Sequence, residues 1–92
     1  MRLNKSEVIA KVRSLVERVI EDTDIFLVDI EAHGTVNNAY IRVFVDTPNR
    51  ITLDQCVYVS RELKKYLDMD NSIGNYTLEV SSPGGRKRGI DV

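Results

Sequence analysis

Two segments rich in β-branched and aromatic residues, 25–32 (IFLVDIEA) and 39–47 (AYIRVFVDT), constrain the fold most strongly. The second segment alternates, with Ile41, Val43 and Val45 on one face. The first segment is expected to alternate in the same way, with one face made of Phe26, Val28, Ile30 and Ala32. The connection HGTVNN is polar and contains Gly34, so we expect an antiparallel hairpin with a loop of several residues. Arg42 is expected to pair across it with Asp29 or Glu31.

Helical periodicity flanks this hairpin on both sides. Residues 4–21 predict a helix that begins at Asn4, with Glu7 completing a capping box. Residues 53–68 predict a second helix, with Thr52 as N-cap and Gln55 at the capping-box position. The apolar stripe of the first helix consists of Val8, Val12, Leu15, Val16, Val19 and Ile20. That of the second consists of Leu53, Cys56, Val59, Leu63, Tyr66 and Leu67.

Residues 76–81 (YTLEVS) alternate again and predict a third strand. The element order αββαβ predicts an α+β two-layer sandwich, with two helices on one face of a three-stranded sheet. A right-handed crossover through the second helix makes the second and third strands parallel. Whether they are neighbours or are separated by the first strand stays open.

The chain length and the net charge narrow the classes of function that are possible. A chain of 92 residues suits one domain, and no apolar run approaches the roughly 20 residues that span a bilayer. We therefore expect a cytoplasmic protein without a membrane partner. A formal net charge of −1 argues against nucleic-acid binding through bulk positive charge, and leaves a local basic patch open.

The residues that could support catalysis do not converge. His33, the single histidine, is expected at the hairpin tip, where no pocket would exclude water from a general base. Cys56, the single cysteine, is expected to pack in the core. The acidic loop at Asp68 and Asp70 lacks the downstream glutamate of a calcium loop. The sequence predicts no enzyme, no metal, no cofactor and no small-molecule substrate.

Two basic clusters carry the binding hypothesis. Arg86, Lys87 and Arg88 lie in the glycine-rich segment 81–92, which is either a phosphate-contacting tail or a solvated linker end. The second cluster, on the second predicted helix, consists of Arg61, Lys64 and Lys65. Alone, that cluster would be an ordinary solvated face.

The stretches RITLDQCVYVSRELKKYLD and NYTLEVSSPG closely resemble the RimP ribosome maturation factors, and the resemblance covers about residues 15–84. It implies a bacterial factor that binds the precursor of the small (30S) ribosomal subunit, rRNA and ribosomal protein included, without a cofactor. The alternative is a protein-interaction or regulatory module that kept the fold without binding the ribosome. We expect a monomer. The predicted contact residues are Glu79, Ser81, Ser82, Gly84, Arg86, Lys87, Arg88, Arg61, Lys64 and Lys65.

The resemblance also implies an N-terminal domain followed by a small β-barrel domain. We expect residues 1–82 to form the first domain and residues 83–92 to be a basic, glycine-rich tail or the start of a linker. After Gly84 the sequence departs from the family pattern, and the barrel is absent from these 92 residues. We expect either that a second domain has been removed or that the chain is a naturally short paralogue.

Overall fold

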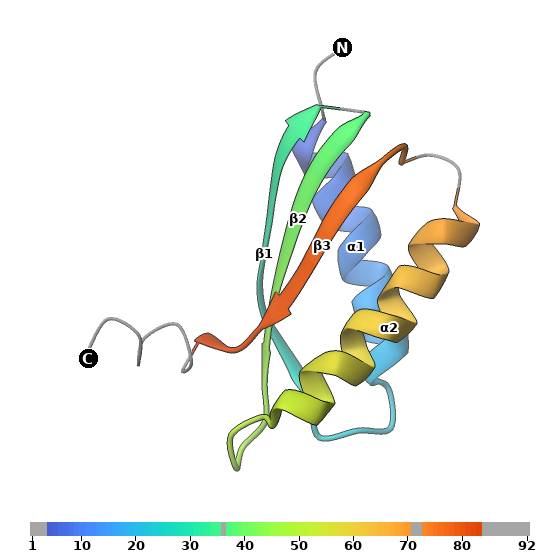
Figure 1. Ribbon diagram of the computed structural model, residues 1–92. Helices are drawn as coiled ribbons and strands as arrows, with labels where there is room; N and C mark the ends of the chain where they lie inside the picture. Colours follow the sequence, from blue (N-terminus) through green and yellow to red (C-terminus); the bar gives the residue numbers. More distant parts are fainter. Residues whose placement is uncertain (1–3, 36, 71–72, 84–92) are drawn as a thin grey trace.

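The predicted element order αββαβ is confirmed by the computed structural model (Figure 1), which describes residues 4–35, 37–70 and 73–83. The elements are α1 (Lys5–Ile20), β1 (Phe26–Thr35), β2 (Asn38–Asp46), α2 (Leu53–Met69) and β3 (Tyr76–Ser81). Both helices lie on one side of the sheet, α1 against β1 and α2 against β3. The fold is the expected α+β arrangement of two helices on a three-stranded mixed sheet.

The middle position of β2 settles the strand order that the sequence left open. The sheet has the order β1-β2-β3, in which β2 pairs antiparallel with β1 and parallel with β3. Its side chains Ile41, Val43 and Val45 face the helices and are fully buried. The helices contribute the valines and leucines of the predicted stripes to the same core: Val8, Val12, Val16, Val19, Val59, Leu63 and Leu67. Burial of these side chains is the main favourable term in folding.

The helix starts follow the predicted capping chemistry. Thr52 Oγ1 accepts from the Gln55 N–H (3.1 Å) and Gln55 Oε1 accepts from the Thr52 N–H (2.9 Å), so the capping box of α2 is confirmed. At α1, Asn4 Oδ1 accepts from the Glu7 N–H (3.2 Å), while the reciprocal bond from Glu7 is not formed within the described residues. A cap of this kind stabilises a protein by about 1 kcal/mol.

A β-bulge at Val28 breaks the alternation predicted for β1. Leu27 lies opposite Val45 and Asp29 lies opposite Phe44, so Val28 is an extra residue. The extra residue shifts the phase of the strand: Leu27 packs against the core before it, and Ile30 after it. The expectation that Phe26 and Val28 share one face with Ile30 and Ala32 is therefore wrong: Ile30 and Ala32 are buried, while Phe26 and Val28 are 47% and 46% exposed.

The hairpin is tighter than the sequence predicted. Thr35 pairs with Asn38, so the strands extend almost to the turn and the expected loop of several residues is wrong. His33 lies within β1, opposite Tyr40 and exposed to solvent, rather than in a loop. Gly34 has a φ of +97°, and a Cβ built there would lie 2.3 Å from the carbonyl oxygen of Asn38. Only glycine fits this position without a shift of the backbone.

Gly34→Ala is therefore expected to lower the free energy of unfolding by about 2 kcal/mol, since it adds both positive-φ strain and a backbone clash. Urea denaturation followed by circular dichroism measures the change. His33→Ala, an exposed neighbour on the same strand, serves as the control and should change stability by less than about 0.5 kcal/mol. Equal stability of the alanine variant at position 34 and the wild type would contradict the assigned backbone conformation.

Candidate functional site

The structure separates the predicted contact residues into two groups on different surfaces. Arg61, Lys64 and Lys65 are exposed on α2. Glu79 and Ser81 lie on the opposite side of the sheet, because they pair with Arg42 and Phe44 of β2, whose neighbours in the strand face the helices. Ser82 follows directly on β3. The other predicted contacts, Gly84, Arg86, Lys87 and Arg88, lie outside the described residues.

The side of the sheet that faces away from the helices, here the open face, is acidic. Arg42 bridges all three strands at its centre, with Nε 2.8 Å from Glu79 Oε1 and a guanidinium nitrogen 3.7 Å from Glu31 Oε1. The predicted pairing of Arg42 with Glu31 is thus confirmed. Asp29, which lies opposite Phe44, adds a further carboxylate to this face. Within the described residues the open face disfavours phosphate groups, because Arg42 is already paired with two carboxylates.

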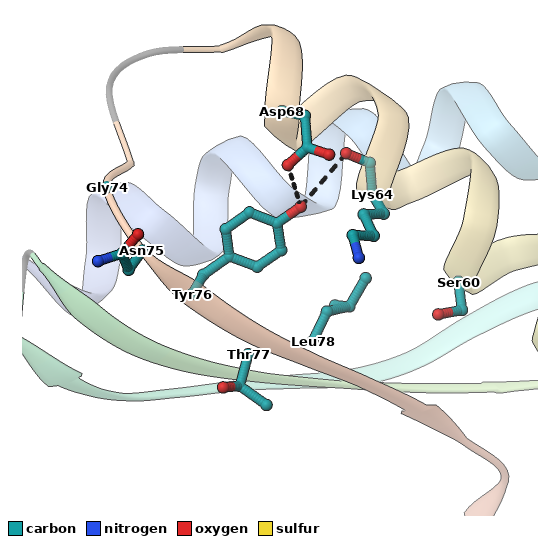
Figure 2. Close-up of a pocket in the computed structure, with 8 residues that line it drawn as sticks. All are labelled: Ser60, Lys64, Asp68, Gly74, Asn75, Tyr76, Thr77 and Leu78. Atoms are coloured by element: carbon teal, nitrogen blue, oxygen red, sulfur yellow. Dashed lines mark hydrogen bonds between the residues drawn. The ribbon is translucent and has the colours of Figure 1, made fainter.

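A groove lies between α2 and β3, with a volume of about 560 Å³. Its helix side is formed by Ser60, Lys64 and Asp68, which recur every four residues and so share one side of α2. Its strand side is formed by residues 74–78. Figure 2 shows the Lys64 side chain extending from α2 toward Leu78 on β3. The groove is consequently lined by polar side chains and backbone, with the apolar side chain of Leu78 between them.

The Tyr76 hydroxyl fixes one end of this groove (Figure 2). It donates to Asp68 Oδ1 at 2.6 Å and lies 3.3 Å from the carbonyl oxygen of Lys64. Burial raises the pKa of Tyr76 well above its ordinary value, and the hydrogen bond to Asp68 and the charge of that carboxylate raise it further. The hydroxyl therefore stays protonated and ties the start of β3 to the last turns of α2.

The three cations of α2 differ in what they contact. Lys65 Nζ lies 3.3 Å from Glu62 Oε2, an exposed pair one helical turn apart. Lys64 and Arg61 form no ion pair among the residues that the structure describes. Arg61 lies at a second, smaller hollow of about 410 Å³ with Val57 and Tyr58. Two of the three predicted cations are therefore available to an anionic group.

The sequence did not reveal the groove. The sequence predicts Tyr76 as an alternating strand residue and Asp68 as part of an acidic loop, and both fall in the stretches that resemble the family, but nothing in the pattern joins them. Both become part of one site because the crossover brings the last turns of α2 beside the first residue of β3. The four-residue spacing of Ser60, Lys64 and Asp68 was the available signal, but it does not say which strand the helix faces.

Nothing in the described residues resembles a catalytic centre. Burial raises the pKa of the Cys56 thiol, and the Asp46 carboxylate raises it further, so the thiolate form is disfavoured and the predicted core position is confirmed. In residues 4–35, 37–70 and 73–83, no group of three or more His, Cys, Asp or Glu side chains is placed to hold a metal ion. No helix in the same ranges is long and apolar enough to cross a membrane. The described residues that line the groove include neither His33 nor Cys56.

The chain matches the model of a known protein family. The model of the RimP N-terminal domain family matches residues 15–86, which is most of the chain. The match covers β1, β2, α2 and β3 entirely, together with the last turns of α1. It therefore includes both the groove and the open face.

Tyr76→Phe is expected to cost about 1 kcal/mol of unfolding free energy, the net value of one hydrogen bond. Because the folded-state pKa is raised, the hydroxyl's contribution is fully present below the ordinary tyrosine pKa of about 10. It is lost only as the pH rises through the higher folded-state value. Ultraviolet titration of the wild type minus that of the variant isolates Tyr76, which should ionise well above pH 10. Ionisation of Tyr76 at its ordinary value would contradict the contact with Asp68.

Proposed function

We propose, from the premise that this chain belongs to the RimP N-terminal domain family, that it acts by binding to the precursor of the small ribosomal subunit. The family is one of ribosome maturation factors for assembly of the 30S subunit, and its members are non-enzymatic. The family match is the single observation that carries the proposal. The surfaces described above are the candidates for such binding.

The side of the domain that carries α2 is the one suited to rRNA. Arg61 and Lys64 have no carboxylate partner among the described residues, so they can neutralise phosphates and release counterions. On the open face, Asp29, Glu31 and Glu79 disfavour RNA. We therefore assign the predicted contacts Glu79, Ser81 and Ser82 to a ribosomal protein, whose positive charge a carboxylate surface attracts.

The basic cluster Arg86, Lys87 and Arg88 completes the proposed RNA contact. It follows the folded part of the chain in sequence, which we place at residues 1–82, with residues 83–92 as a tail or linker. Contacts of this kind position a protein on RNA without reading its sequence. We propose that the protein acts in the cytoplasm, as a monomer.

Binding to immature small subunits should weaken as salt rises. Arg61→Ala, and separately the triple change Arg86→Ala, Lys87→Ala and Arg88→Ala, should each reduce the affinity. Log affinity falls as log salt rises, and each variant should make this fall less steep, by about 1 in the slope for each phosphate contact that is lost. Co-sedimentation with immature subunits across a salt series measures both quantities.

Arg13→Ala, at an exposed position of α1 on another part of the surface, is the matched control and should leave the slope unchanged. An unchanged slope in the triple variant would remove the tail from the proposal. Absence of binding at every salt concentration would favour the alternative, a protein-interaction or regulatory module that kept this fold.

A further inference from the structure

We infer that the groove between α2 and β3 binds an extended segment of a partner protein, which pairs with β3 as a fourth strand and places a carboxylate against Lys64. This site shares Lys64 with the RNA contacts proposed above, but it also uses the outer edge of β3 and requires neither RNA nor the open face. It stands whether or not the domain binds the ribosomal particle.

The first argument is the hydrogen-bonding direction of β3. The Ala39 N–H donates to the carbonyl of Asn75 at 3.0 Å, and the parallel register continues from there to Phe44 opposite Ser81. In a parallel ladder alternate residues direct their backbone groups to the same neighbour. Residues 75, 77, 79 and 81 therefore bond to β2, while the N–H and C=O groups of Tyr76, Leu78 and Val80 point away from the sheet.

These outward groups have no strand beside them in the described part of the chain, since the sheet ends at β3. An unpaired edge of this kind is a template for another strand. Peptide recognition by strand addition uses it directly, with the main chain supplying affinity and pockets for alternate side chains supplying specificity.

The second argument is the shape of the space beside that edge. The groove runs along residues 74–78, with α2 as its second wall (Figure 2). A strand laid against β3 would direct every second side chain toward the helix, into a space bounded by Ser60, Lys64 and Asp68. The volume of about 560 Å³ is in the range of ligand sites in proteins.

The third argument is charge, and it selects the occupant. The Lys64 side chain lies in the groove and its ammonium has no carboxylate partner in the described residues. Asp68, the other charged group of the groove, is occupied by the Tyr76 hydroxyl at 2.6 Å. Asp68 keeps its negative charge in that bond, so the groove carries one charge of each sign. The Lys64 ammonium is the one without a partner among the described residues, and an incoming strand that carries an Asp, a Glu or a C-terminal carboxylate can pair with it.

Two other occupants fit less well. A second copy of this chain, paired edge to edge about the middle of β3, would bring its own Lys64 near the same point, because Lys64 extends toward Leu78. The two ammonium groups would then repel each other. RNA can offer a phosphate to Lys64, but a phosphate backbone has no alternating donors and acceptors to satisfy the edge of β3.

The test uses the full chain and a displayed library of random linear peptides about twelve residues long. We expect selected peptides to combine β-branched residues with a carboxylate. Against Lys64→Ala these peptides should lose roughly tenfold in affinity, the effect of one charge-assisted contact. Lys65→Ala removes the same charge from the next position of α2 and should leave the affinity unchanged. N-methylation of alternate peptide bonds in a selected peptide should abolish binding.

Amide hydrogen exchange supplies a second readout that does not depend on a variant. Bound peptide should slow exchange of the Tyr76, Leu78 and Val80 amides. The proposal is overturned if no selected peptide discriminates Lys64→Ala from Lys65→Ala, or if N-methylated peptides bind as well. It is also overturned if those amides are slowed by single-stranded RNA alone, or by raising the protein concentration alone, which would identify RNA or a second copy as the occupant. Since no ribosomal particle is present, these outcomes are independent of the co-sedimentation result.

Discussion

The parallel pairing of β3 with β2 is the constraint on which the rest of the structure depends. Parallel neighbours cannot be joined by a tight turn, so residues 47–75 must return along the sheet, and they do so as α2. That return covers the core-facing side chains Ile41, Val43 and Val45. It also places α2 beside the outer edge of β3, which creates the groove and brings Asp68 within reach of Tyr76.

Local signals were enough to predict most of the fold. Thr52 with Gln55, the valine stripe of α1 and the alternation of β2 each specify their element without help from distant residues. The features that escaped prediction depend on pairing. Val28 is apolar, so the sequence pattern looks unbroken through the bulge, and only the register with Val45 and Phe44 exposes it. The extended hairpin likewise depends on Thr35 meeting Asn38.

For the predicted site residues too, local signals give the position in an element, whereas the contacts depend on how the elements pack. Charge and helical spacing placed Arg61, Lys64 and Lys65 on the solvent side of α2, as found, but could not say that Lys65 is paired with Glu62 while Lys64 lies beside β3. Glu79 was singled out by the family motif, and the structure engages its carboxylate with Arg42. A motif residue can therefore hold the sheet together and still lie on a surface open to a partner.

Because Val28 is a bulge, β1 can lose this one residue without turning its core-facing side chains to the other face of the sheet. In a regular ladder one added or removed residue would turn every later side chain to the other face. Here the register passes from Leu27 directly to Asp29 in its pairing with β2, so a chain one residue shorter at this point would keep Leu27 and Ile30 on the core side and Asp29 outside. Position 28 is thus a place where related chains can differ in length by one residue while sharing one core.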